Sequence, residues 1–326
     1  MKISAAFATS MQTPEHVRIA EALGYERAWL YDSPALYPDV WVALALAAER
    51  TSTIGLGPAV LVPTLRHPMT NAAAIATLVD LAPGRVAVAL GAGFTGRYVL
   101  GQRPMKWRDV DAYVRALKAL LRGEETEWEG KPIKMLHPDG FGAARPIDVP
   151  ILIGADGPKG LAVAREVADG VFSAARPVNG DGPAWRAVLA FGTVIADGED
   201  VGSPRVLDAA GHGLAVAYHA VYERGGAAAV GGLPGGAAWR AGVEAAPVER
   251  RHLLTHENHL VSLTERDRAA LAEGASLLPA LTFTGSPAEL RDKVAALEAA
   301  GATELAYQPA GPVIPGELER MMAALQ

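Results

Sequence analysis

The sequence predicts an α/β protein built as a closed (β/α)8 TIM barrel. Its 326 residues can be divided into eight strand-like segments that alternate with helical ones. The strand segments are continuous apolar runs, which is typical of parallel strands covered on both faces. A doubly wound parallel sheet is the alternative, but its first strand is usually followed by phosphate-binding glycines, and here Ala8-Thr9-Ser10-Met11 follows.

The first four units have recognisable helix starts and ends. Pro14 and Pro68 suit the first turn of a helix, and Gly24 is typical of a helix end. Strands are expected at residues 3–8, 27–31, 54–62 and 85–90, and helices at about 13–23, 40–50, 68–81 and 107–121. A polar segment, residues 124–146, leads into the second half of the chain.

The second half begins with a short apolar strand at residues 149–153, a glycine turn and a helix that starts at Pro158. Asp156 is expected to cap this helix with its side chain. The remaining expectations are a strand at 171–174, a helix at about 183–197, a weakly marked strand starting at 206, a helix from 287 to 300, a strand at 304–307 and a last helix after 315.

Residues 211–281 break this rhythm. They contain three glycine pairs, with helical patterns at about 214–224 and 248–273. A structureless loop of this length is rare in a compact domain. We therefore expect an insertion between strand seven and its helix, within a single domain of residues 1–326.

Composition excludes several classes of function. The chain has no cysteine, which excludes disulfides, thiol nucleophiles and thiolate-bound metals. The net charge is −6, and the basic residues are scattered, so no nucleic-acid partner is expected. No apolar run is long enough to span a membrane, and the first residues lack the pattern of a signal peptide, so a cytoplasmic protein without a membrane partner is expected.

In such a barrel the active site lies at the carboxyl ends of the strands. The turn at residues 154–159 suits a phosphate there, because glycines allow close backbone approach and a helix start attracts anions. An ordinary strand-to-helix turn explains the same residues, and the spacing matches neither a P-loop nor a dinucleotide fold. No pair of carboxylates stands out, so these loops suit a large, flat, phosphate-bearing cofactor better than acid–base hydrolysis.

Several blocks of the sequence together resemble the luciferase-like monooxygenase superfamily. In chain order they include Asp32-Ser33-Pro34, Arg66-His67-Pro68, the run Gly91-Ala92-Gly93-Phe94-Thr95-Gly96-Arg97, the run Gly154-Ala155-Asp156-Gly157-Pro158-Lys159, and Gly285-Ser286-Pro287. The resemblance covers nearly the whole chain except residues 211–281. It is nearest to the branch of the coenzyme F420-dependent methylenetetrahydromethanopterin reductases and their actinobacterial relatives.

This resemblance implies a barrel that binds coenzyme F420, a deazaflavin, with FMN as the alternative. It also implies a cis peptide bond between Ala59 and Val60 in strand three, behind the cofactor ring, and a homodimer. The implied reaction moves a hydride between reduced F420 and a small unsaturated or imine-like organic substrate. Ser33 and Phe94-Thr95 replace a histidine and a glutamate of the relatives that oxidise sugar phosphates, so a sugar-phosphate substrate is not expected.

Two other functions remain open. One is a reduced-FMN-dependent monooxygenase supplied by a separate flavin reductase, and the other is a cofactor-free binding protein on the same barrel. For the F420-dependent reaction, residues 211–281 are interpreted as a lid over the substrate.

The candidate site residues fall into three groups. Asp32 and His67 are the candidates for catalytic proton transfer. The substrate candidates are Arg97, His252 and His256. The cofactor-binding candidates are Ser33, Ala59, Val60, Gly91, Gly93, Gly154, Ala155, Asp156, Gly157, Lys159 and Arg176.

The histidines near residue 256 allow several interpretations. If residues 248–273 form one helix, His252, His256 and His259 share a face. They would then line a substrate pocket, hold a metal ion or form a polar face over the barrel mouth. A polar face and substrate contact are favoured, and no metal site is predicted.

Overall fold

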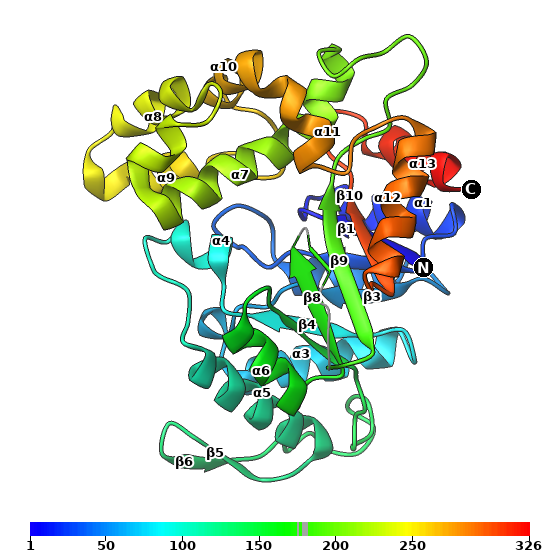
Figure 1. Ribbon diagram of the computed structural model, residues 1–326. Coiled ribbons are helices and arrows are strands. Elements are labelled where there is room, and N and C mark those ends of the chain that lie inside the picture. Colours follow the sequence, from blue (N-terminus) through cyan, green and yellow to red (C-terminus); the bar gives the residue numbers. More distant parts are fainter. Residues whose placement is uncertain (175, 178–181) are drawn as a thin grey trace.

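The structure, a computed structural model, describes residues 1–174, 176–177 and 182–326 and contains an eight-stranded parallel barrel (Figure 1). The strands are hydrogen-bonded in the order β3-β2-β1-β10-β9-β8-β7-β4. This confirms the predicted fold class. The strands are β1 Lys2–Phe7, β2 Arg27–Leu30, β3 Gly55–Pro58, β4 Val88–Gly91, β7 Ile151–Gly154, β8 Gly170–Ala174, β9 Trp185–Phe191 and β10 Glu304–Gln308.

Helices surround the barrel on its outer side (Figure 1). Ser286 starts α12 as predicted, because its hydroxyl accepts from the Glu289 amide while the Glu289 carboxylate accepts from the Ser286 amide. Residues 124–146, expected only as a polar connection, include a two-stranded hairpin, β5 Thr126–Trp128 and β6 Lys131–Ile133. The helices are α1 Thr13–Ala22, α2 Val40–Ala48, η1 Pro63–Leu65, α3 Pro68–Leu81, α4 Phe94–Tyr98, α5 Trp107–Arg122, α6 Pro158–Val167, α12 Pro287–Ala299 and α13 Ile314–Leu325.

The barrel closes between β3 and β4, through a bulge in the third strand. Isolated parallel bridges join Leu56 to Val86 and Leu61 to Leu90. Between these two bridges the third strand contains one more residue than the fourth, which is the mark of a bulge. The strand expected at 54–62 is therefore regular only over Gly55–Pro58. Gly57 allows the seam to form, because a Cβ atom there would lie 1.9 Å from the carbonyl oxygen of Ala87.

The prediction for strand seven is wrong. The segment Trp185–Phe191, expected as the start of a helix, forms β9 between β8 and β10, whereas residue 206 lies in a helix. The segment contains Ala, Leu and Arg, which are good helix formers, and Pro183 before it imitates a helix start. Pairing on both edges overrides this local preference, since strand propensity depends mainly on context.

The long stretch between β9 and α12 is helical. In Figure 1 these helices gather on the side toward which the β8 and β9 arrows point, beyond the carboxyl ends of the strands. They have a core of their own around Tyr218, Trp239 and Leu271. The elements are α7 Pro204–Gly231, α8 Gly236–Glu244, η2 Val248–Arg250, α9 Arg251–Thr255, α10 Glu265–Gly274, η3 Ala275–Leu277 and α11 Leu278–Leu281.

The continuous helix expected over residues 248–273 is not present. Its path is broken after α9, where Asn258 and Leu260 have φ angles of 55° and 62°. Such left-handed conformations interrupt a helix and are uncommon for residues other than glycine. We call residues 256–260 the mouth turn, since they lie against the barrel as described below.

At the opposite end, polar groups close the barrel interior. Glu304, fully buried, accepts hydrogen bonds from the indole Nε1 of Trp29 at 2.7 Å and from that of Trp185 at 2.6 Å. The guanidinium of Arg27 lies 5.2 Å from the centroid of each of these rings. A buried carboxylate requires such partners, so this end of the barrel is filled by its own side chains.

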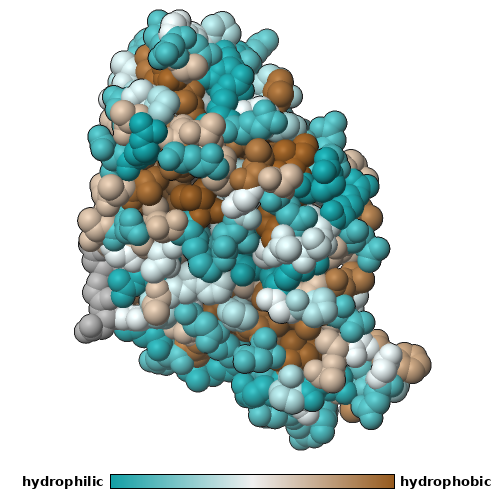
Figure 2. All heavy atoms as spheres, turned by 90° about the vertical axis from the view of Figure 1, so that its right-hand side faces the viewer, coloured by the Kyte–Doolittle hydropathy of each residue, from teal (hydrophilic) through white to brown (hydrophobic). Residues whose placement is uncertain are grey.

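The face of the molecule in Figure 2 mixes hydrophilic and hydrophobic residues, with the apolar residues in several separate groups. Across the residues that the structure describes, none of the helices combines the length and apolar character needed to cross a membrane.

The seam gives a prediction about stability. Gly57→Ala should lower the free energy of unfolding by at least about 3 kcal/mol, because its methyl group would overlap the Ala87 carbonyl in a tightly packed interior. Urea denaturation followed by circular dichroism measures this loss. Gly142→Ala is the matched control, because only the His137 ring comes as near as 4.0 Å to an added Cβ there. Equal stability of both variants would contradict the assignment of this seam.

Candidate active site

The carboxylate of Asp32 lies directly after β2 at the carboxyl end of the barrel. Its side chain is only 1% exposed, and Arg66 Nη1 donates to both of its oxygens at 2.7 Å. The same guanidinium donates through Nη2 to Asp39 at 2.7 Å. The Arg66 guanidinium is thus held between two carboxylates.

Burial and the ion pair with Arg66 have opposite effects on the pKa of Asp32. Burial raises the pKa of its carboxyl group, and the hydrogen bond and charge of Arg66 only partly reverse that shift. The result is a buried carboxylate whose charge depends on one guanidinium. Ser33, the next residue, turns the chain here, because its carbonyl accepts from the amides of Leu36 and Tyr37.

The peptide bond between Ala59 and Val60 is cis, as predicted. It lies in the third-strand bulge, and it directs Val60 toward β4 and β7. A Cβ atom at Gly91 would lie 3.0 Å from Val60 Cγ2, and one at Gly154 would lie 2.6 Å from Val60 Cγ1. These two glycines therefore make room for Val60. Gly93 does the same for Val62, at 2.6 Å, and has a φ angle of 78°.

The start of α6, where the sequence predicts a phosphate cradle, is an uncapped helix start. Gly157 is the N-cap residue, and no side chain caps the first turn. Pro158 has no N–H and Leu161 donates to the Gly157 carbonyl, so the amides of Lys159 and Gly160 are the donors without an intrahelical acceptor. Gly157 and Lys159 are exposed, and a Cβ at Gly157 would meet nothing within 4 Å. The prediction that Asp156 caps α6 is wrong, because its Oδ1 accepts instead from the Ala174 amide at 2.8 Å. Ala155, by contrast, is buried.

Two arginines add positive charge beside this cradle. Arg176 and Arg224 both act on the carboxyl group of Asp156, and their charges oppose the rise in its pKa that burial causes. Arg224 comes from α7, and its guanidinium lies 5.0 Å from the centroid of the Phe94 ring. Arg224 is a site residue that sequence analysis missed, because only the fold brings residues 156 and 224 together.

His67 lies outside the barrel mouth. It is exposed, and its Nδ1 accepts from the Met69 amide as the N-cap of α3. Its ring packs edge-on against Trp128 of the β5–β6 hairpin, with centroids 6.1 Å apart. The structure thus does not bring His67 and Asp32 together, and the catalytic role of His67 stays a prediction.

The mouth turn covers the carboxyl end of the barrel. Leu260, 9% exposed, belongs to the apolar cluster inside the barrel that includes Trp29 and Ala59. Its carbonyl accepts from Gln308 Nε2 at 2.9 Å, and the carbonyl of His259 accepts from the Tyr37 hydroxyl. These contacts attach the turn to β10 and to the segment after β2.

The three predicted substrate residues do not lie together in the structure. Arg97, in the last turn of α4 at the rim, donates to Thr64 Oγ1 and to the Arg103 carbonyl, both at 2.6 Å. His252 also lies at this rim, where its ring approaches Gly101. His256 is fully buried and joins His259 and His219 instead. His219 could not be found from spacing, because it lies in a different helix.

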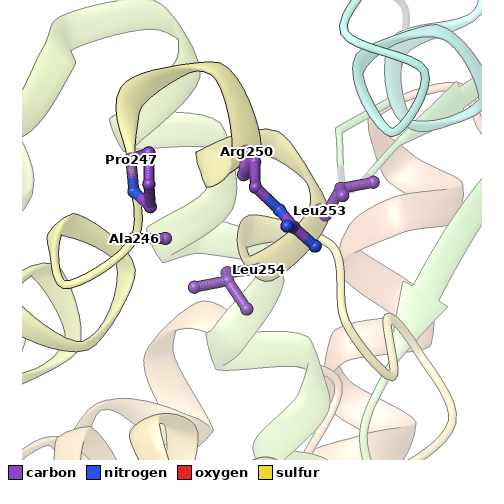
Figure 3. Close-up of a pocket in the computed structure, with 5 residues that line it drawn as sticks. All are labelled: Ala246, Pro247, Arg250, Leu253 and Leu254. Atoms are coloured by element: carbon purple, nitrogen blue, oxygen red, sulfur yellow. The ribbon is translucent and has the colours of Figure 1, made fainter.

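Two surface pockets lie away from these residues. One, of about 330 Å³, is formed by the turn between α8 and α9, and Figure 3 shows Arg250 reaching toward Leu253 along its wall. The other, of about 670 Å³, lies at the amino-terminal end of the barrel beside Arg27 and Trp185. Neither pocket is lined by a candidate site residue, and the candidate site remains the covered mouth between Asp32, Val60 and the start of α6.

Comparison with known families agrees with this geometry. The sequence profile described as "Luciferase-like monooxygenase" matches residues 8–304. The chain belongs to this family. The match includes the whole helical stretch between β9 and α12, of which residues 211–281 lay outside the resemblance seen in the sequence.

Relatives with assigned names include methanopterin enzymes. The 5,10-methylenetetrahydromethanopterin reductase of Archaeoglobus fulgidus is 33% identical over 180 residues, which are 53% of this chain and 52% of that protein. The enzyme of the same name from Methanopyrus kandleri is 33% identical over 173 residues, 48% of this chain and 49% of the relative. The chain therefore spans about half the length of the curated relatives it matches.

Solved structures share the fold over the full length. The coenzyme F420 dependent tetrahydromethanopterin reductase of Methanopyrus kandleri has a TM-score of 0.66 and 19% identity, covering 100% of this chain and 99% of that one. The oxygenating constituent of the 3,6-diketocamphane monooxygenase of Pseudomonas putida, in complex with FMN, has a TM-score of 0.61 and 15% identity, covering 100% and 98%. At these identities the likeness concerns the fold alone.

The buried pair of Asp32 and Arg66 gives a testable prediction. Arg66→Leu should lower the free energy of unfolding by about 3–5 kcal/mol, because it leaves the Asp32 carboxylate buried without its partner. Adding Asp32→Asn should recover part of this loss, since the uncompensated charge is removed. Chemical denaturation of the single and double variants tests it. A loss below about 1 kcal/mol, or no recovery in the double variant, would contradict the account.

Proposed function

We propose that this protein is an oxidoreductase that transfers a hydride between reduced coenzyme F420 and a small unsaturated or imine-like organic substrate. The observation that carries the proposal is the third-strand bulge that turns Val60 toward Gly91 and Gly154, at the same end of the barrel as the uncapped start of α6, where Arg176 and Arg224 act on Asp156. The residues fit a flat ring with an anionic tail: a shaped apolar wall for the ring and free amides for the phosphate. When bound, reduced F420 would supply the hydride.

The protein would orient the reactants and manage the proton. Val60 and the two glycines opposite it would form the wall behind the ring. Lys159 and the amides after Gly157 would bind the phosphate, with Arg224 beside them. Hydride addition to a C=C or C=N bond requires a proton at the second atom. Asp32 is the proposed group for positioning that proton, because it lies at the mouth and His67 faces the outer hairpin.

The helical stretch between β9 and α12 would act as a lid. We propose that the mouth turn moves when a cofactor enters, because Leu260 now occupies part of the barrel's apolar interior. Few bonds would have to break, mainly those from Tyr37, Thr95 and Gln308. The same covered mouth also supports the alternative of a cofactor-free binding protein, so the proposal must be tested by binding.

Titration of the purified full-length chain with F420 and with FMN tests the proposal. We expect micromolar binding of F420, followed by its absorption and fluorescence. Lys159→Glu should weaken that binding by about 1–3 kcal/mol, or roughly 5- to 150-fold, because a charge-assisted contact is lost. Lys131→Glu, on the distant β6 strand, is the control with the same change in charge.

Each outcome of the titration decides between the functions. Binding of FMN alone would favour a monooxygenase supplied by a flavin reductase. Binding of neither would favour the cofactor-free protein. An unchanged affinity in the Lys159→Glu variant would remove the α6 cradle from the site, whichever cofactor binds.

We also propose that the chain forms a homodimer through α2. Val42 and Leu46 lie one helical turn apart on this helix and are 59% and 39% exposed, and covering them would remove apolar area from water. Light scattering should give about 68 kDa, twice the 34.0 kDa of the chain. Val42→Glu with Leu46→Glu should give the monomer mass. A monomer in the unmodified chain would refute the proposal.

A further inference from the structure

Three buried histidines converge between the helical layer and the barrel. His219 comes from α7, and His256 and His259 come from the mouth turn. They are 3%, 0% and 4% exposed. One ring nitrogen of each lies within 4.8 Å of those of the other two. Distant parts of the chain thus bring three imidazoles to one point that is shielded from water.

Hydrogen bonds explain only part of this cluster. The Nδ1 atoms of His219 and His259 are 2.9 Å apart, and His259 Nε2 lies 3.1 Å from Thr95 Oγ1. Among the described residues, neither ring nitrogen of the fully buried His256 has a hydrogen-bond partner. Leaving a buried polar atom unpaired costs free energy, so such a group in a folded protein requires an explanation.

The groups around His256 suit a bound cation next to its ring better than a further hydrogen-bond partner. Glu223 Oε1, one turn after His219 on α7, lies 3.5 Å from His256 Nε2. The Tyr98 ring stacks on the imidazole with an angle of 14° between the planes and centroids 6.4 Å apart, which fixes its orientation. Arg266, the cation whose charge acts on His219, is itself paired with Glu257 at 3.0 Å.

We propose that His219, His256 and His259 bind one divalent transition-metal ion, with the carboxylate of Glu223 at or beside the fourth position. Three imidazoles and one oxygen ligand suit zinc, and also cobalt or nickel. Metal–nitrogen bonds of about 2.0–2.1 Å place tetrahedral ligand nitrogens about 3.3 Å apart, so ring movements of about 1 Å would complete the site.

The ion would join the lid to the barrel. Through His219 it binds α7, and through His256 and His259 it fixes the mouth turn, whose Leu260 lies inside the barrel. It would therefore stabilise the covered state of the mouth. This inference rests on side chains outside the cofactor cradle and does not depend on which cofactor the barrel takes.

Metal binding can be tested on the full-length chain, produced without a polyhistidine tag and treated with a chelator. After addition of Zn²⁺ and gel filtration, elemental analysis should find one equivalent per chain. His256→Gln and His219→Gln should each retain less than a tenth of an equivalent. His252→Gln is the matched control, because this neighbouring histidine lies at the rim and outside the cluster. It should retain the full equivalent.

A second readout needs no substitution. Zinc X-ray absorption of the unmodified chain should show imidazole scattering from about three histidines, and Co²⁺ should give the visible absorption of a tetrahedral ion. Substoichiometric zinc in the unmodified chain, unchanged zinc in both cluster variants, or a zinc spectrum with fewer than two imidazoles would each overturn the proposal. If a variant fails to fold, the zinc X-ray absorption spectrum of the unmodified chain tests the proposal by itself. Failure here leaves the cofactor titration unaffected.

Discussion

The position of Val60 is the constraint on which the mouth of this barrel depends. The bulge in the third strand turns this side chain toward β4 and β7, and a Cβ atom at either Gly91 or Gly154 would overlap it. Gly57 meets a related requirement on the same strand, where the backbone of the fourth strand comes too close for any side chain. One bulge thus accounts for glycines on three strands. It also leaves an apolar wall facing the space between Asp32 and the start of α6.

The two ends of the barrel use charge differently. At the amino-terminal end Glu304 is satisfied by two indoles beneath Arg27, and the interior is closed by those rings. At the carboxyl end Asp32 depends on Arg66, and the positive charges of Arg176 and Arg224 act on Asp156, just before the uncapped start of α6. At the amino-terminal end the buried carboxylate therefore has its hydrogen-bond partners within the protein. The carboxyl end leaves cationic groups and amides available for an anion, covered by a turn that is attached through a few hydrogen bonds.

Sequence patterns predicted the barrel and most of its strands because buried parallel strands are continuous apolar runs. They failed at β9, where helix-forming residues sit between two strands whose pairing overrides local preference. They found the turn at Gly157 but misassigned Asp156, since capping and a hydrogen bond to a neighbouring strand look alike in sequence. Glycines 91 and 154 were expected to approach a cofactor, and the structure shows that they accommodate Val60. Arg224 and His219 could not be predicted as site residues from sequence patterns, because their partners are distant in the chain and come together only in the fold.

In the proposed complex a cofactor ring enters between Val60 and the mouth turn, with its phosphate at the start of α6. A crystal structure of the full-length chain grown with F420 tests this most directly. We expect a phosphate bound by the amides after Gly157 and by Lys159, the ring against Val60, and Leu260 displaced from the barrel interior. A cofactor bound elsewhere while Leu260 stays in the apolar cluster would contradict this proposal.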